Sequence, residues 1–251
     1  MPDSNEPAQH VKPFVYESLN SKALHFSISE IQSRMRLEDP HALDLEYTRT
    51  MMGFLLFLPE PRSITMLGLG GGSLAKFCYR YLPQAVIQVV EINPHVIALR
   101  DEFHVPPDDA RFMVLQGDGA KFVRHSTARC DVLMVDGYDS SGLPSALSSQ
   151  RFYDDCLDLL EPEGIMVANL HQAAPRYKVC VDRIRRSFEE AVFVAEDGEQ
   201  GNSIVFACKG RRFEKYRPGV VRRPRNLHRT AAEQLLAAFA LVSTALKDQR
   251  A

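Results

Sequence analysis

Two aspartates that follow an apolar stretch of the chain could act together on an amine. Asp136 ends the stretch 131–136, and Asp139 lies three residues later in a glycine-containing loop. Two nearby carboxylates attract an ammonium group, and one of them can take its proton as the nitrogen attacks. The alternative for Asp139 is structural, because an aspartate in a polar loop often caps a turn.

A glycine-rich turn offers a second kind of chemistry. Gly68, Gly70 and Gly71 follow the apolar segment 63–67 and precede a predicted helix over 74–82. Glycine lets a chain turn sharply and lets the backbone approach a ligand closely. A strand, a glycine turn and a helix in this order are typical of a nucleotide-binding corner, although such turns also serve purely structural ends.

Glu91 is a candidate ligand for a ribose. It ends the predicted strand 86–91 and lies 21 residues after Gly70, about the spacing at which an acid reaches a ribose hydroxyl in dinucleotide-binding folds. The alternative is a helix cap. Asn93 and Pro94 already provide a cap and a first-turn proline for the next helix, so we favour the ribose role.

Asp118 and Gly119 follow the predicted strand 111–116. The Asp118 carboxylate could accept a hydrogen bond from an adenine amino group, and the next backbone N–H could contact the ring. Asp118 also suits the N-cap of a helix, and both roles can hold at once.

The elements that would position these residues alternate between strand and helix. Short apolar strands separated by helices indicate a mostly parallel sheet that is covered on both faces. The last two strands follow each other without a helix, which predicts an antiparallel edge. We place strands at 14–16 and 24–28, a helix at 44–58, and further strands at 63–67, 86–91, 111–116, 131–136, 164–169, 190–195 and 203–208.

The chain of 251 residues is long enough for one domain with small additions. No run is long enough to span a membrane, and the N-terminus lacks the pattern of a signal peptide, so we expect a cytoplasmic protein. Scattered cysteines and histidines without ligand spacing predict no metal. We divide the chain into a flexible tail (1–12), a small β/helix region (13–60), a nucleoside-binding domain (61–210) and a basic linker with an amphipathic helix (211–251).

The basic linker, residues 211–229, holds eight lysines and arginines and one acid, Glu214. The net charge of the whole chain is −2, so the remainder is acidic. We expect the linker to neutralise that remainder or a dimer partner, and we do not expect nucleic acid as a partner. Leu235, Phe239, Val242 and Leu246 recur at helical spacing and predict a helix that docks on the domain or on a second subunit.

Four motifs in sequence carry a family resemblance: GLGGGS, VVEIN, GDGAKF and VDGYDSSGLPSAL. In this order they resemble the spermidine synthases, the polyamine aminopropyltransferase family, over residues 14–208. The resemblance implies a Rossmann-like α/β fold with a seven-stranded sheet of the class I methyltransferase type, a short N-terminal β region and a C-terminal helix. It also implies decarboxylated S-adenosylmethionine as donor, a small-molecule amine as acceptor, and a homodimer.

The resemblance also implies roles for individual residues. Asp136 would be the general base on the attacking amine, and Asp139 and Tyr47 would help to hold the acceptor. On the donor side, Glu91 would hold the ribose and Asp118 the adenine. The donor site as a whole would comprise Gln32, Gly68, Gly70, Gly71, Ser73, Glu91, Asp118 and Gly119.

The chain departs from the family pattern in both halves of the site. Ser73 stands where the family has an aspartate for the donor's amine, and Asn169 and His171 stand where it has a glutamine and an acid. An aspartate would repel the carboxylate of ordinary S-adenosylmethionine, and Ser73 removes that repulsion. Ordinary S-adenosylmethionine is therefore an alternative donor.

Two other functions stay open at this point. One is an S-adenosylmethionine-dependent methyltransferase acting on a small molecule, and donor preference separates it from aminopropyl transfer. The other is a non-catalytic homologue that binds a nucleoside without turnover.

Overall fold

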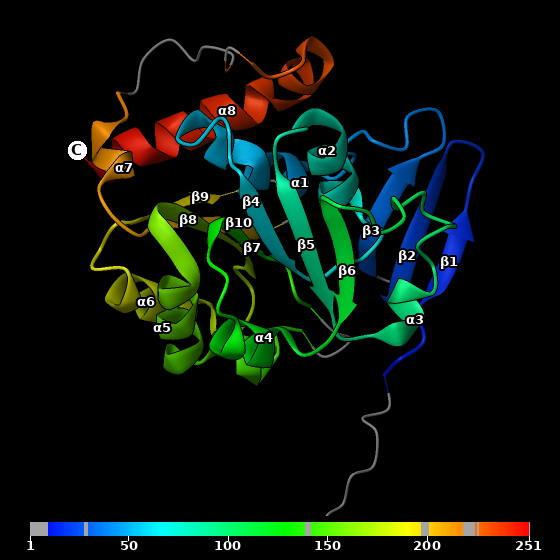
Figure 1. The fold of residues 1–251 in the computed structure, drawn as a ribbon, viewed down its shortest axis with the longest axis horizontal. Helices are drawn as coiled ribbons and strands as arrows, with labels where there is room; N and C mark the ends of the chain where they lie inside the picture. Colours follow the sequence, from blue (N-terminus) through cyan, green and yellow to red (C-terminus); the bar gives the residue numbers. More distant parts are fainter. Residues whose placement is uncertain are drawn as a thin grey trace, which may run out of the picture.

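The computed structural model describes residues 10–27, 30–138, 142–196, 201–217, 224 and 226–250. Its centre is a seven-stranded sheet in the order β6-β5-β4-β7-β8-β10-β9 (Figure 1). This confirms the predicted Rossmann-like α/β fold. The strands are β4 (Ser63–Leu67), β5 (Val86–Glu91), β6 (Phe112–Gln116), β7 (Cys130–Val135), β8 (Leu160–His171), β9 (Val192–Glu196) and β10 (Asn202–Cys208).

The order of the strands along the chain reverses at β4, in the middle of the sheet. Strand β4 pairs in parallel with β5 on one side and with β7 on the other. In an open α/β sheet, ligands bind at such a switch point, in the crevice beyond the carboxyl ends of the strands. The glycine turn follows β4, Glu91 ends β5 and Asp136 follows β7. All three therefore lie at the carboxyl ends of the strands around this switch point.

The last two strands form the predicted antiparallel edge. Strand β10 is antiparallel to its neighbours as expected, but it lies between β8 and β9, and β9 takes the edge. The reason is visible in β10, whose seven residues are all buried. Such a strand gains more from an interior position than from an edge.

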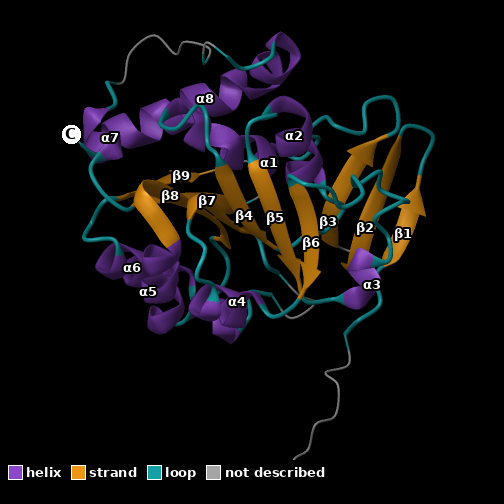
Figure 2. Cartoon of the chain, viewed as in Figure 1, coloured by secondary structure: helices purple, strands orange, loops and turns teal. Residues whose placement is uncertain are grey.

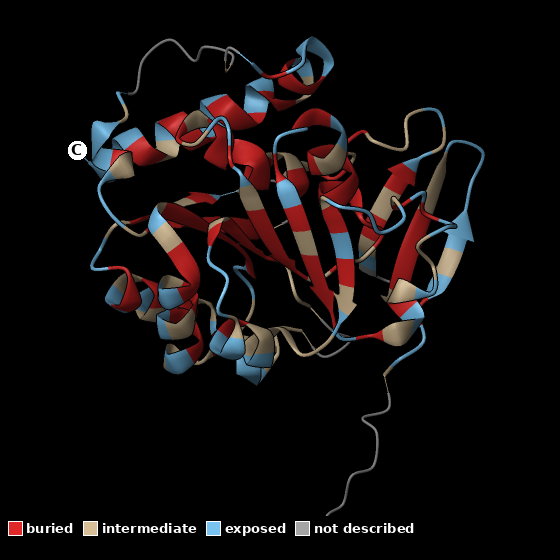
Figure 3. Cartoon of the chain, viewed as in Figure 1, coloured by how far each residue is buried: buried red, intermediate tan, exposed pale blue. Residues whose placement is uncertain are grey.

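Helices cover both faces of the sheet (Figure 2). Along β7, Val132 and Met134 join one hydrophobic core, while Leu133 and Val135 join the other, as the two-residue period of a strand requires. Figure 3 shows the buried strands between helices with exposed outer faces. One face is covered by α1 (Glu46–Met51), α2 (Ser73–Tyr81) and α8 (Arg229–Gln249), and the other by α4 (Gly119–His125), α5 (Gln150–Leu159) and α6 (Tyr177–Ser187).

The N-terminal region is a separate antiparallel sheet of three strands, in the order β1-β2-β3. The sequence predicted the first two, β1 (Phe14–Glu17) and β2 (Ser21–Ser27), but not β3 (Glu30–Arg36). Polar and charged residues dominate β3, and Met35 supplies its buried hydrophobic side chain. The predicted strand 24–28 runs one residue beyond β2, and Ile28 lies outside the described residues.

The helix predicted over 44–58 is shorter and changes type. Helix α1 gives way to a 3₁₀ helix, η1 (Met52–Leu56). Gly53 lowers α-helix propensity here and permits a close approach, because a Cβ on it would lie 2.6 Å from Val242 Cγ2 of α8. The absence of a side chain at Gly53 therefore lets Val242 of α8 pack directly against η1.

Helix α8 docks on its own domain, against α1, η1 and β9. Leu235, Phe239, Val242 and Leu246 are buried, while Leu236 beside them is 48% exposed.

No helix in the part of the chain that the structure describes could cross a bilayer. The remaining short elements are α3 (Pro94–Ile97), η2 (Ser145–Ser148) and α7 (Arg212–Lys215).

The described part of the basic linker contacts acids of the chain. Lys215 Nζ lies 2.9 Å from Glu163 Oε1, and Arg211 Nε lies 2.7 Å from Glu214 Oε2. The first pair joins the linker to an acid of the remainder of the chain, and the second lies within the linker. Exposed pairs of this kind contribute little stability each.

Candidate active site

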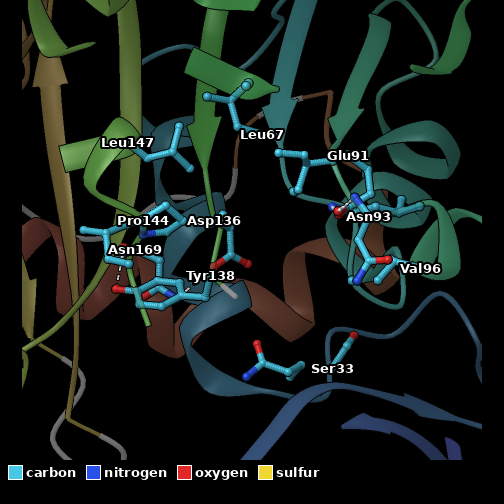
Figure 4. A pocket seen from close by; sticks show the side chains of 18 of the residues that line it. Ser33, Leu67, Glu91, Asn93, Val96, Asp136, Tyr138, Pro144, Leu147 and Asn169 are labelled. Carbon is cyan, nitrogen blue, oxygen red and sulfur yellow. Dashed lines mark hydrogen bonds between the residues drawn. The ribbon is translucent and has the colours of Figure 1, made fainter. Parts of the chain in front are cut away.

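A cavity of about 1100 Å³ lies at the carboxyl ends of β4, β5 and β7. Figure 4 shows Asp136, Tyr138 and Asn169 grouped on one side of it, with Glu91 and Asn93 on the other. Its size is slightly above the usual range for ligand pockets, about 300–1,000 Å³. Most of the predicted site residues line it: Gln32, Tyr47, Gly68, Gly70, Ser73, Glu91, Asp118, Gly119 and Asp136.

Two other predicted site residues, Asp139 and Gly71, are not among these lining residues. Asp139 lies outside the described residues. Gly71 is not part of the cavity wall, because it packs against the interior: a Cβ on it would lie 2.7 Å from Ser33 Oγ and 2.9 Å from Phe103 Cδ1. Its glycine is therefore required by packing at the turn.

The glycine turn holds the end of β4 against the end of β7. Gly68 has a φ of 98°, and a Cβ on it would come within 2.3 Å of the Asp136 carbonyl oxygen. Gly72 has a φ of 68° and is the N-cap of α2. Both positions need the left-handed conformations that glycine adopts without strain.

Glu91 is fixed by the backbone on both sides. The Leu69 amide donates to Glu91 Oε2 and the Asn93 amide donates to Oε1, each at 2.8 Å. Burial raises the pKa of Glu91, and these amide hydrogen bonds oppose that rise. Asn93 is the cap of α3, since its side chain accepts from the His95 amide, so Glu91 is not needed as a cap.

Asp118 is the N-cap of α4. Its Oδ1 accepts hydrogen bonds from the Ala120 amide at 2.8 Å and the Lys121 amide at 3.2 Å. The structural alternative is therefore correct for this residue. Because both bonds end on Oδ1, Oδ2 is left for a ligand in the cavity.

Asp136 is held by hydrogen bonds to both of its carboxylate oxygens. Tyr47 donates its O–H to Oδ2 at 3.2 Å, and Asn169 donates from Nδ2 to Oδ1 at 2.9 Å. Burial raises the pKa of Asp136, while these two bonds and His171 act in the opposite direction. Burial and the adjacent Asp136 raise the pKa of Tyr47, so the tyrosine stays a hydrogen-bond donor.

The sequence did not assign a role to Asn169, Asn202 or Tyr138. Asn169 Oδ1 and Asn202 Oδ1 are buried and have no hydrogen-bond partner among the described residues, and both residues line the cavity. Tyr138 accepts from the His171 amide at 3.0 Å and donates to the Asn169 carbonyl at 3.2 Å. Buried acceptors are normally paired with protein groups, water or a ligand, so the two asparagine oxygens can accept hydrogen bonds from a molecule in the cavity.

Ser73 begins α2 and meets a second hydroxyl. Ser73 Oγ lies 3.4 Å from Ser33 Oγ of β3, and both serines are buried in the wall of the cavity. A pair of hydroxyls can both donate and accept, and neither has a formal charge.

The N-terminal segment also reaches the cavity, where Asn93 Nδ2 donates to the Val11 carbonyl at 2.8 Å.

Comparison with known proteins decides the family. The spermine/spermidine synthase domain matches residues 44–196. A polyamine aminopropyltransferase of Chromobacterium violaceum is 39% identical over 206 residues, which cover 81% of this chain and 79% of the relative. The chain belongs to the spermine/spermidine synthase family. It is therefore a transferase, and the resemblance stated from its motifs is confirmed.

Solved structures agree with the fold of this spermidine-synthase-family chain. A spermidine synthase in complex with the transition-state analogue AdoDATO has a TM-score of 0.64 at 21% identity, covering 93% of this chain and 87% of that one. Human methyltransferase-like protein 13 in complex with SAH has a TM-score of 0.60 at 21% identity, covering 78% and 92%. The same sheet is thus shared by two kinds of transferase, and the site must distinguish between them.

Proposed function

We propose that this chain transfers an aminopropyl group from decarboxylated S-adenosylmethionine to an amine acceptor. The observation that supports this most is the environment of Asp136: a carboxylate held by Tyr47 and Asn169 in the wall of a cavity, with a raised pKa. Such a group accepts a proton from an ammonium more readily than an ordinary aspartate does.

The reaction needs alignment and one proton acceptor. The amine nitrogen attacks the aminopropyl carbon attached to sulfur, a C–N bond forms, and the C–S bond breaks as methylthioadenosine leaves. The amine proton passes to Asp136. Because the sulfonium carbon is already electrophilic, placing the two reactants in line supplies much of the rate.

We assign each of the other residues of the site either to the donor or to the acceptor. We assign the donor's ribose to Glu91 and its adenine to Asp118 Oδ2, with Gln32, Gly68, Gly70 and Gly119 forming the surrounding wall. We assign the attacking nitrogen to Asp136 and to the unpaired Asn169 Oδ1, with Asp139 as a further acceptor-side acid. In the described residues we find no cluster of histidine, cysteine or acid side chains that could hold a metal ion.

Product analysis tests this function directly. The full chain is incubated with decarboxylated S-adenosylmethionine and a panel of primary amines, and methylthioadenosine and the aminopropylated amine are measured together. We expect equal amounts of both products. Tight binding of methylthioadenosine without turnover of any amine would instead indicate the non-catalytic homologue.

The hydroxyl pair of Ser33 and Ser73 favours a second candidate, the use of ordinary S-adenosylmethionine for methyl transfer. A carboxylate would find two hydroxyl donors here, where the family pattern has a repelling aspartate at the position of Ser73. Calorimetric titration with both donors separates the candidates. A clear preference for the decarboxylated donor supports aminopropyl transfer, and equal or tighter binding of the carboxylated donor supports methyl transfer.

Ser73→Asp provides a matched variant for this titration. A carboxylate at this position would attract the bare ammonium of the decarboxylated donor and repel the carboxylate of the other. We expect the preference for the decarboxylated donor to rise by about tenfold, the effect of one pKa unit of interaction energy. Ser73→Ala adds no charge and removes one hydroxyl donor, so it should change the preference by less than Ser73→Asp does. A homodimer stays a prediction from the family resemblance, and a cytoplasmic location stays a prediction from the sequence pattern.

A further inference from the structure

Three polar residues on neighbouring strands form a row across the end of the sheet. Asp136 follows β7, Asn169 lies near the end of β8, and Asn202 begins β10. Strand β10 is antiparallel to β8, so its first residue lies beside the carboxyl end of β8, where it pairs with His171. The row therefore lies at the end of the sheet that opens into the cavity, and all three of its members line the cavity.

The side chains of the row lie on the same face of the sheet. Met134, Val167 and Ile204 belong to one hydrophobic core, and each member of the row is two positions away from one of them. Residues two positions apart in a strand share a face. The hydrogen bond of 2.9 Å from Asn169 Nδ2 to Asp136 Oδ1 shows that the first two members meet (Figure 4).

Asn202 is the last member of the row, and its amide oxygen can still accept a hydrogen bond. The residue is only 3% exposed, and its Oδ1 has no hydrogen-bond partner among the described residues. Because Asn169 pairs with Ile204, Asn169 and Asn202 are diagonal neighbours, and such residues lie about 7–8 Å apart. A molecule that contacts Asn169 in the cavity can therefore also reach Asn202.

The order of the strands gives the acceptor a direction. The residues that we assign to the donor lie at β4, β5 and β6, whereas the row runs from β7 through β8 to β10, on the other side of β4. Neighbouring strands are about 4.8 Å apart, so Asp136 and Asn202 are separated by roughly 10 Å. An amine whose reacting nitrogen lies beside Asp136 can thus extend along the row, away from the donor, as far as Asn202.

We propose that Asn202 is a specificity-determining residue for the acceptor, and that its Oδ1 accepts a hydrogen bond from a second nitrogen of the amine. The inference rests on the proposed function. A second ammonium at this point regains part of its lost hydration from the amide oxygen, whereas a methyl group in its place leaves Oδ1 unpaired. Because Asn202 would contact a part of the acceptor that does not react, it should affect KM for the acceptor and not kcat.

Two amines of matched length test the proposal: 1,4-diaminobutane, and n-pentylamine, in which a methyl group replaces the second ammonium. Their affinities are measured by calorimetry on the full chain saturated with methylthioadenosine, and the ratio of the two gives the diamine preference. We expect Asn202→Leu, which is similar in size but has no acceptor, to lower this preference by about tenfold, through weaker binding of the diamine. KM for the diamine should rise in parallel, with kcat within about twofold of the native value.

Two further variants make the test specific. Asn202→Asp retains an acceptor and adds a charge, so it should preserve or raise the diamine preference. Ser203→Ala is the matched control: Ser203 is fully buried and its Oγ also has no partner among the described residues, but it does not line the cavity. Its loss should leave the preference unchanged.

Several results would overturn the inference. A native chain that binds both amines equally would do so, and so would a diamine preference that Asn202→Leu leaves unchanged or that Ser203→Ala lowers as much. If Asn202→Leu does not bind methylthioadenosine and is therefore misfolded, a lowered preference in Asn202→Asp would overturn it instead. Any of these results with product formation intact contradicts only the inference. Failure of every amine to give product contradicts the proposed function, and with it the inference.

Discussion

At the scale of single residues, the state of Asp136 decides what the site can do. Its burial raises its pKa, and the hydrogen bonds from Asn169 and Tyr47 limit that rise. Asp136 can accept a proton only when it is ionised, so activity should fall as the pH drops through its pKa. The sequence predicted Asp136 and Tyr47 at the site, but the contact with Asn169 depends on the pairing of β7 with β8, which no local pattern fixes.

The pH profile of an Asn169 variant tests this balance. Asn169→Ala removes a hydrogen bond that stabilises the ionised carboxylate, so the pKa of Asp136 should rise further and the acidic limb of kcat should move to higher pH. Tyr47→Phe should move the limb in the same direction. A limb that stays in place in both variants, with kcat reduced equally at every pH, would show that these residues do not act through Asp136.

At the scale of elements, the glycine turn lines the cavity and also allows the ends of β4 and β7 to approach each other closely. The strand–turn–helix pattern predicted β4, α2 and the turn between them, because apolar strands and glycine are strong local signals. Strand β3 has no such signal, because most of its residues are polar. The effect of Gly53 in η1 depends on its contact with α8, which is distant in the sequence. What the sequence missed is therefore mostly set by contacts between remote segments.

Gly68→Ala tests the constraint at the turn. The added Cβ meets a left-handed φ and a backbone oxygen that cannot move aside, so we expect a loss of about 2–4 kcal/mol in unfolding free energy, above the usual cost of backbone strain. Gly201→Ala is the matched control, because Gly201 has a φ of 68° but open space around its Cβ position. Its cost should be about 1–2 kcal/mol. Equal losses by denaturant titration would show that the contact with the Asp136 backbone is unimportant.

At the scale of the whole molecule, the C-terminal helix belongs to the transferase domain. Helix α8 shares a hydrophobic core with α1, α2 and one face of the sheet, and the amphipathic pattern predicted its buried residues correctly. The sequence left open whether the helix docks on its own domain or on a second subunit. The structure places it on its own domain, where Val242 packs directly against Gly53.

Truncation of one core residue in α8 tests that placement. Phe239 is fully buried, so Phe239→Ala should reduce the unfolding free energy by about 3–5 kcal/mol. Leu236→Ala on the exposed side of the same helix should cost less than about 1 kcal/mol. The two variants are compared by denaturant midpoints in a single unfolding transition. Similar small losses would indicate that α8 is not part of the folded core.

The most direct test of the whole account is the turnover of Asp136→Asn beside the native chain. The variant preserves the size of the side chain but cannot accept the proton of the amine. We predict that kcat for methylthioadenosine release falls by about 10²-fold to 10⁴-fold, while calorimetric affinity for the donor changes by less than about threefold. A variant that retains native kcat would contradict the role of Asp136 as the base and the mechanism built on it.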